Sequence, residues 1–149
     1  MYKRQAFAQR LVAAHMALTP TLTLWETVSP NASPEELENG MSRAAQQLQA
    51  FSQAGGQVLF GTDVGYIDRF DTSEEFKWMS RAGMSYQQIL ASLTTSPAQR
   101  FGYTTHNGRI AKGMDADLVV LSGDPAQNTS AFSKVRYTIR GGEVIYAEK

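Results

Sequence analysis

Near the N-terminus, the apolar positions predict a helix followed by a short strand. Four apolar residues fall on one helical face: Phe7, Leu11, Ala14 and Leu18. This spacing is typical of an amphipathic helix, and Pro20 is expected to end it because proline cannot continue a helix. Residues 21–25, TLTLW, alternate between polar and apolar side chains, which predicts a strand.

The next segment predicts the longest helix of the chain, with a signal at each end. Ser33 is followed by Pro34 and then by Glu36, which is the pattern of a capping box with proline at the first helical position. Apolar residues then recur at steps of three and four: Leu37, Met41, Ala44, Leu48 and Phe51. Gly55 and Gly56 are expected to end this helix.

A buried strand is predicted almost immediately after this helix. Residues 58–61, VLFG, are apolar without alternation, as expected for a strand that is covered on both faces of a parallel sheet. Strand, helix and strand therefore follow one another from residue 21 to residue 61. That order predicts a right-handed βαβ unit and an α/β fold.

From residue 72 onward, the pattern predicts three shorter helices and then strands. Helix starts are indicated at Thr72, Ser85 and Ser96, and the last of these helices is expected to end at Gly102. Strands are predicted at 116–121, ADLVVL, and in a hairpin whose turn is Gly141 and Gly142. This change from predicted helices to predicted strands indicates an internal boundary between residues 102 and 115.

Composition narrows the classes of function. The chain has 149 residues, enough for one ordinary domain or two very small ones, and its 14 basic and 14 acidic residues cancel. We therefore expect neither a nucleic-acid partner nor a membrane partner. No signal peptide and no apolar run of membrane-spanning length is seen, so the sequence predicts a soluble chain and leaves its compartment unknown.

Metal chemistry is limited by the residue types that are present. The chain has no cysteine and two histidines, so only His, Asp, Glu and carbonyl oxygen remain as metal ligands. His15 and His106 are each expected to be surface or packing residues. Asp115 and Asp117 flank the start of a predicted strand and fit a hydrogen-bonded turn better than a cation site.

One carboxylate stands where a parallel sheet is open to ligands. In VLFGTDVG, residues 58–65, Asp63 follows the buried strand and lies between Gly61 and Gly65. The carboxyl ends of parallel strands form the reactive edge of α/β folds, so Asp63 is a candidate metal ligand or general base. An N-cap or a loop-bracing carboxylate explains the same residue, and both interpretations stay open.

Four segments, taken together, resemble one family. They are GTDVG at 61–65, AGMSYQQILASLTTSPAQRFG at 82–102, GRIAKGMDADLVVL at 108–121 and VRYTIRGGEVIY at 135–146. In order and spacing they are similar to the C-terminal part of the metal-dependent amidohydrolase superfamily. The nearest group is that of imidazolonepropionase-like and Xaa-Pro dipeptidase-like proteins. The similarity runs over roughly residues 18–147.

This resemblance implies an α/β fold that forms the C-terminal portion of a (β/α)8 TIM barrel, with strands of a small β-sandwich. Residues 21–25 would be the seventh barrel strand and residues 58–63 the eighth. Residues 1–102 would form the partial barrel, and residues 103–149 would belong to the composite sandwich. The histidines and the bridging residue of earlier barrel strands have no counterpart here, and a full barrel needs about 250 residues, so a fragment is expected.

The resemblance also implies a reaction. Asp63 would be the catalytic aspartate that contacts the metal and moves a proton, and the substrate would be a small amide, either a dipeptide or an imidazolone-like ring. Thr62, Gly65, Asp68 and Arg69 are candidates for the substrate loop. A divalent metal, with zinc expected, would act in the full-length protein, whereas this chain alone is expected to hold none and to be inactive.

Two non-catalytic alternatives remain. In the first, the chain is an assembly module that forms a homo-oligomer or associates with the missing N-terminal part, because a slice of a barrel leaves sheet edges unpaired. In the second, which the four matching segments disfavour, it is a self-sufficient α/β ligand-binding domain.

Overall fold

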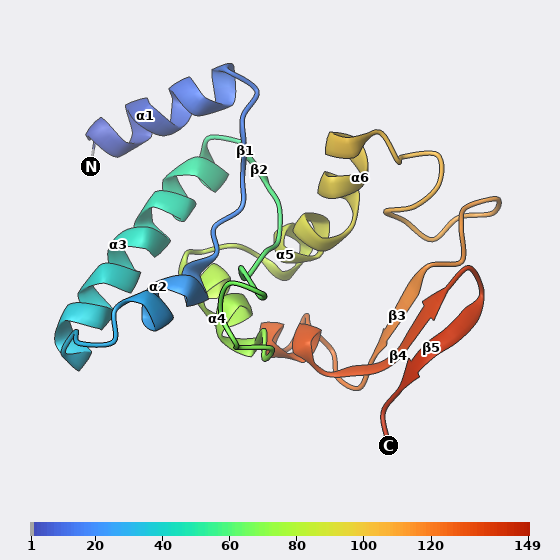
Figure 1. Cartoon of the computed structure of the whole chain (residues 1–149). Helices are drawn as coiled ribbons and strands as arrows, with labels where there is room; N and C mark the ends of the chain where they lie inside the picture. Colours follow the sequence, from blue (N-terminus) through green and yellow to red (C-terminus); the bar gives the residue numbers. More distant parts are fainter. Residues whose placement is uncertain (1) are drawn as a thin grey trace.

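The computed structural model describes residues 2–149, which form a helical layer followed by a small sheet at the C-terminus (Figure 1). The first half contains α1 (Tyr2–Ala13), β1 (Ala17–Leu18), α2 (Leu22–Val28), α3 (Pro34–Gln53) and β2 (Gln57–Val58). The second half contains α4 (Ser73–Arg81), α5 (Tyr86–Leu93), α6 (Thr95–Phe101), β3 (Leu118–Leu121), the 3-10 helix η1 (Thr129–Ser133), β4 (Val135–Arg140) and β5 (Glu143–Ala147).

The strands β1 and β2 lie side by side and parallel, with Ala17 opposite Gln57 and Leu18 opposite Val58. Helices α2 and α3 connect them, so a parallel strand pair with a helical crossover is present, although the second strand covers Gln57–Val58 and not residues 58–61. Figure 1 shows the two strands running together between α3 and α5. The carboxyl ends of both strands therefore open at the same edge of this sheet.

The position of the first strand was predicted wrongly. Residues 21–25 do not form a strand, since Leu22–Val28 is helix α2, and the strand lies earlier, at Ala17–Leu18. The first helix also ends at Ala13 and does not reach Pro20. It ends there because His15 adopts a left-handed φ of 53°, while the amides of His15 and Met16 bond back to Val12 and Leu11.

Helix α3 has the predicted ends. The Ser33 hydroxyl accepts from the Glu36 amide, and the Glu36 carboxylate accepts from the Ser33 amide, which completes the capping box. At the other end, the amides of Gly55 and Gly56 donate to the carbonyls of Ser52 and Phe51. The hydrogen bond from the Ser33 backbone is the main cause of a lowered pKa for Glu36, whose side chain is exposed.

The three later helices also form where they were predicted. The second capping box, between Ser85 and Gln88, is present, and α6 ends at Gly102 with a φ of 80°. The predicted cap at Thr72 is wrong in detail, because the Thr72 side chain makes no cap bond. Instead, the Asp71 carboxylate accepts from the backbone amide of Ser73 at 2.9 Å, which lowers the pKa of Asp71.

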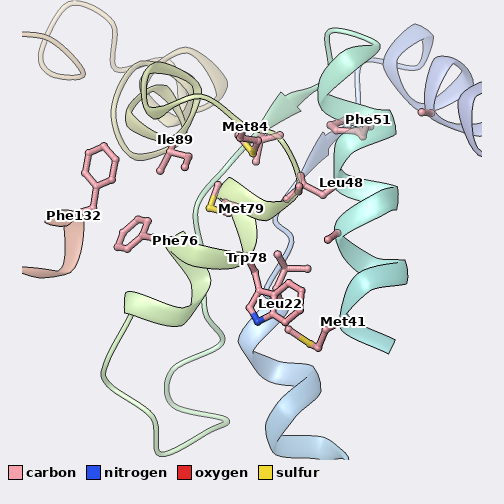
Figure 2. Packing of buried hydrophobic residues seen from close by; sticks show 14 residues of the cluster. Leu22, Met41, Leu48, Phe51, Phe76, Trp78, Met79, Met84, Ile89 and Phe132 are labelled. Atoms are coloured by element: carbon pink, nitrogen blue, oxygen red, sulfur yellow. The ribbon is translucent and has the colours of Figure 1, made fainter. Parts of the chain in front are cut away.

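One buried cluster connects these helices (Figure 2). Its large members come from α2, α3, α4 and the segments that follow them: Leu22, Met41, Leu48, Phe51, Phe76, Trp78, Met79, Met84, Ile89 and Phe132. The Phe76 ring stacks on Phe60 at 4.6 Å and lies 5.3 Å from Phe132 of η1. These aromatic contacts fasten the C-terminal segment to α4.

The C-terminal strands form an antiparallel sheet in the order β3-β4-β5. The predicted hairpin is confirmed, with Gly141 and Gly142 at φ values of 57° and 86°, the left-handed conformations that a two-residue hairpin turn needs. The Asp117 carboxylate accepts from the Gly141 amide at 2.8 Å and so braces this turn. Among the helices of residues 2–149, none combines the length and apolar character needed to cross a bilayer.

A buried carboxylate holds α2 in place. Glu75 of α4 is fully buried, and its two carboxylate oxygens accept from the backbone amide of Leu22 at 2.9 Å and from that of Thr23 at 2.8 Å. The Thr23 hydroxyl donates to the same carboxylate at 2.8 Å. Thr21, at the N-cap position, has a left-handed φ of 43° and makes no side-chain cap bond, so Glu75 caps α2 from another helix.

Two opposing effects act on the Glu75 carboxyl. Burial raises its pKa above the ordinary value of 4.5, while the hydrogen bonds from Leu22 and Thr23 act in the opposite direction. Burial is the larger effect. The folded chain therefore holds the Glu75 proton to a higher pH than the unfolded chain does.

We expect Glu75→Ala to destabilise the fold strongly. The substitution would leave the buried amides of Leu22 and Thr23 without an acceptor, at a cost of about 1–3 kcal/mol for each unpaired donor. Chemical denaturation of the wild type and the variant measures this loss. Glu74→Ala is the matched control on the same helical turn, because Glu74 forms a partly exposed ion pair with Lys77 and should change the free energy of unfolding by about 1 kcal/mol or less. Equal effects of the two substitutions would contradict the assigned role.

The raised pKa of Glu75 also predicts a pH dependence. The stability that its titration contributes is fully present below pH 4.5 and is lost as the pH rises through the raised pKa of the folded state. Glu75→Gln cannot titrate, so the free energy of unfolding of the wild type minus that of this variant should fall over that interval. This subtraction cancels the contribution of the other carboxylates to the pH dependence of the free energy of unfolding. A difference that is constant with pH, or that rises with it, would show that burial does not dominate.

Candidate functional site

The carboxyl ends of β1 and β2 meet at one open edge of the sheet, defined here as the rim and formed by residues 19–21 and 61–63. Gly61 is required there, because a Cβ at this position would lie 2.5 Å from Cγ2 of Thr19. Because Gly61 has no side chain, the two strand ends can approach each other closely. The Thr62 side chain next to it is buried, at 7% exposure, and Asp63 follows at the surface.

Asp63 is exposed and has a left-handed backbone, with a φ of 60°. Its backbone carbonyl accepts from the amides of Tyr66 at 3.0 Å and Ile67 at 3.2 Å, so the backbone of Asp63 braces the turn. Aspartate is among the non-glycine residues that tolerate this conformation best. The turn is therefore closed by the carbonyl, and the Asp63 carboxylate stands at the rim.

The loop that follows, residues 64–72, is ordered by short-range contacts. Val64 and Ile67 form an isolated bridge, and the Gly65 amide donates to the Ile67 carbonyl at 3.2 Å. Ile67 is buried at 3% exposure, whereas Tyr66 and Phe70 are 78% and 81% exposed. The loop therefore rests on one apolar anchor and directs two aromatic rings toward the surface, close in sequence to Asp63.

Arg69, a predicted substrate-loop residue, has a partner within the chain. Its guanidinium donates to the Glu26 carboxylate of α2, to which Trp78 Nε1 also donates at 3.3 Å. Arg69 thus ties the loop to α2, whereas Asp68 beside it is exposed. Of the predicted loop residues, Thr62, Gly65 and Asp68 lie along the rim or the loop, and Arg69 serves its anchoring.

Sequence reasoning missed Glu75, although a signal was present. Glu75, Met79 and Ala82 are spaced at four and three residues along α4, and all three are buried. A carboxylate on the apolar face of a helix requires hydrogen-bond donors from elsewhere in the fold. Because Glu75 holds the start of α2 directly after β1, it fixes one side of the rim.

The other candidates lie away from the rim in plain structural roles. His15 is exposed, and its backbone carbonyl accepts from the Arg100 guanidinium at 2.9 Å. His106 is also exposed, with Nδ1 3.5 Å from a carboxylate oxygen of Asp115. The Asp117 carboxylate accepts from the Gly141 amide in the hairpin turn, which agrees with the predicted hydrogen-bonded turn.

The candidate metal-binding side chains of the described residues are not gathered at one place. Across residues 2–149, no group of three or more His, Cys, Asp or Glu side chains is placed to hold a metal ion. Asp63 offers one carboxylate at the rim, and a structural or catalytic zinc site takes three or four protein ligands. This donor set therefore does not fit a divalent metal by itself.

The chain matches the model of one protein family. The model of the Amidohydrolase family matches residues 4–146, nearly the whole sequence. The chain belongs to the Amidohydrolase family. The match begins closer to the N-terminus than the resemblance of the four segments did, so α1 is also part of the family pattern.

Solved amidohydrolase-related structures share the fold. A prolidase complexed with N-methylphosphonate-L-proline is 23% identical, with a TM-score of 0.78, over 97% of this chain and 38% of its own. A Xaa-Pro dipeptidase with methionine bound in its active site is 23% identical, with a TM-score of 0.77, over 93% of this chain and 36% of its own. The chain therefore spans little more than a third of these structures.

A curated amidohydrolase shares a shorter segment. Amidohydrolase tasK of Hapsidospora irregularis is 46% identical over 43 residues, which make up 29% of this chain and 4% of that protein. Together with the family match, these similarities confirm the resemblance to amidohydrolases and Xaa-Pro dipeptidases. They also confirm an α/β fold of mixed helices and small sheets.

We expect Arg69→Ala to loosen the loop of this amidohydrolase chain without unfolding it. Loss of the bond to Glu26 should increase hydrogen exchange at the amides of Tyr66 and Ile67, which close the turn on the Asp63 carbonyl. The increase should be about fivefold or less, because a partly exposed ion pair contributes about 1 kcal/mol at most. Asp68→Ala is the neighbouring control. Equal exchange in all three proteins would show that the Arg69 contact does not hold the loop.

Proposed function

We propose that this chain is the C-terminal part of a hydrolase that cleaves an amide C–N bond, and that Asp63 is its contribution to the catalytic centre. The observation that carries the proposal is the position of Asp63, exposed at the shared carboxyl edge of two parallel strands. The turn behind it is closed by the backbone, which leaves the carboxylate available to accept and release a proton.

In this proposal, β1 and β2 are two neighbouring strands of a (β/α)8 barrel, the seventh and the eighth. The parallel pairing and the helical crossover through α3 support this assignment, with Ala17–Leu18 replacing residues 21–25 as the seventh strand. Residues 1–102 form the barrel part and residues 103–149 the β-sandwich part. The chain's span of little more than a third of its solved neighbours agrees with a barrel that is completed from elsewhere.

The remaining catalytic groups come from outside residues 2–149. The family resemblance implies a divalent metal, with zinc expected, that Asp63 would contact and whose other ligands the described residues do not supply. Accordingly, the isolated chain is inactive. When bound in the complete centre, the metal would supply activated water, while the residues of this chain position the rim and move the proton.

The substrate class that we propose is a dipeptide with a Xaa-Pro amide bond. Support comes from the Xaa-Pro dipeptidase and the prolidase whose folds this chain shares. A cyclic imidazolone-like substrate, the other option that the sequence suggested, has no counterpart among those two proteins. Thr62, Gly65 and Asp68 would border the bound substrate, and the anchored loop would carry Tyr66 and Phe70 beside it.

We expect Asp63→Asn to abolish most activity of the longer polypeptide that contains this chain. The amide keeps the size of the side chain but cannot take up a proton, so kcat/KM for Xaa-Pro dipeptides should fall by about 10²-fold or more. Asp115→Asn removes a similar exposed charge that lies outside the rim and the loop, beside His106, and should leave kcat/KM within a few-fold of wild type. An active Asp63→Asn enzyme would contradict the role proposed for Asp63.

A second candidate function is that of an assembly module that binds another copy. One observation favours it: large apolar side chains of the C-terminal sheet are exposed, among them Val119, Val120, Val144, Ile145 and Tyr146. Single exposed apolar residues are ordinary, but a group of them on one small sheet is typical of an interaction surface.

A further inference from the structure

The loop of residues 64–72 has one side fixed to the protein and one side turned outward. Ile67 is buried, and Arg69 is held by the Glu26 carboxylate of α2. Three exposed residues alternate with these two anchors: Tyr66, Asp68 and Phe70. Such alternation is typical of an extended segment along a surface, because side chains two positions apart point to the same side. We define these three residues as the outer row of the loop.

The outer row begins beside Asp63, at the open edge of the sheet. The Tyr66 amide donates to the Asp63 carbonyl at 3.0 Å, so the two residues stand at the ends of one turn, with Cα atoms about 7 Å apart or closer. Figure 1 shows the segment between β2 and α4 beyond the ends of β1 and β2, next to α2. In a complete barrel this edge stays open, because substrates enter among the loops that follow the strands. The outer row therefore borders the space for a substrate of Asp63.

The outer row presents a negative charge. The other charged side chains of the loop have partners within the chain, since Arg69 donates to Glu26 and the Asp71 carboxylate accepts from the amide and the hydroxyl of Ser73. The ion pairs found among the residues that the structure describes do not include Asp68. The positive charge of the loop is thus neutralised by α2, and the charge left on the outer row is that of a carboxylate.

Two aromatic rings flank this carboxylate along the chain. The Tyr66 and Phe70 side chains are both largely exposed, one on each side of Asp68. An aromatic ring attracts a cation through its negative face, and a carboxylate attracts the same cation through its full charge. The rings also offer apolar contact to the carbon atoms next to that cation. A row of ring, carboxylate and ring therefore favours a positively charged ligand group and repels a negatively charged one.

The dipeptide substrate proposed above has one such group. Its α-amino group has an ordinary pKa of about 7.7–8.0 and is therefore mostly a cation at neutral pH. Its other end is a carboxylate, which Asp68 repels. We infer that the outer row binds the α-ammonium group of the substrate, with Asp68 as its ion-pair partner and the rings of Tyr66 and Phe70 at its sides.

This inference rests on the proposed hydrolase function and adds the orientation of the substrate to it. The amino end of the dipeptide lies against the loop, and the scissile amide lies toward Asp63. Asp68 is thereby a specificity-determining residue, because it distinguishes peptides with a free amino terminus from peptides whose amino terminus is blocked.

Steady-state kinetics of the longer polypeptide that contains this chain tests the inference. The two probes are Ala-Pro and N-acetyl-Ala-Pro, which differ in the charge of the amino end. We expect the wild type to prefer Ala-Pro. Asp68→Asn should lower kcat/KM for Ala-Pro by about tenfold, mainly through a higher KM, because it removes a charged hydrogen-bond partner that binds the substrate before and during the reaction. The value for N-acetyl-Ala-Pro should change by about twofold or less.

Three further variants separate the parts of the outer row. Tyr66→Leu and Phe70→Leu keep an apolar side chain but remove the ring face, so each should lower kcat/KM for Ala-Pro by about two- to fivefold. Glu74→Gln is the matched control, because it removes one negative charge from α4, where Glu74 pairs with Lys77 outside the loop. It should leave the preference for Ala-Pro unchanged. Circular dichroism verifies that each variant keeps its helices.

The possible contrary results are distinguishable. An active Asp68→Asn enzyme that keeps the wild-type preference, or that loses activity equally on both probes, would overturn the role of Asp68 and leave the hydrolase proposal intact. An equal loss of preference in Glu74→Gln would show that only the overall charge matters. A wild-type polypeptide that does not cleave Ala-Pro would contradict the proposed function, and this inference with it.

Discussion

The capping of α2 by a carboxylate from another helix is the interaction on which the arrangement of this chain depends. Glu75 is fully buried and accepts hydrogen bonds from the first two amides of α2 and from the Thr23 hydroxyl. A buried carboxylate is costly unless its oxygens are satisfied, and the start of a helix presents donors that need acceptors. The carboxylate of Glu75 and the first amides of α2 therefore satisfy each other's hydrogen bonds. As a result, α2 and α4 are fixed against each other directly beside the rim.

Helix α2 links this capping interaction to the candidate site. Its first residues follow β1, whose end meets Gly61 and Thr62 at the rim, and its Glu26 binds Arg69 of the loop that Asp63 begins. One short helix is therefore held at its start by Glu75 and in turn holds the loop. The conformation of Asp63 and of the loop therefore depends on packing that lies away from the exposed Asp63 carboxylate.

Sequence patterns predicted the elements whose signals are local. The capping boxes at Ser33 and Ser85 and the hairpin at Gly141 and Gly142 are all present, because caps and turns are decided by residues a few positions apart. The first strand was misplaced because TLTLW alternates like a strand, while its helical state depends on Glu75, some fifty residues away. No local pattern contains that contact.

The candidate site was predictable in one respect and not in others. Asp63 could be singled out because it follows a buried strand between two glycines. The left-handed backbone of Asp63 and the role of its carbonyl in closing the turn depend on the loop that follows. Arg69 looked like a substrate contact because its partner, Glu26, lies on helix α2, whose first residues the sequence pattern had assigned to a strand at 21–25.

The central claim is that this amidohydrolase chain supplies Asp63 to a centre whose other metal ligands lie outside it, and metal analysis of the purified 149-residue chain tests that claim most directly. After dialysis against zinc, manganese, iron or nickel and removal of the free ions, elemental analysis should find far less than one tightly held metal ion per chain. One tightly bound ion per chain would contradict the account, because the described residues would then form a complete site by themselves.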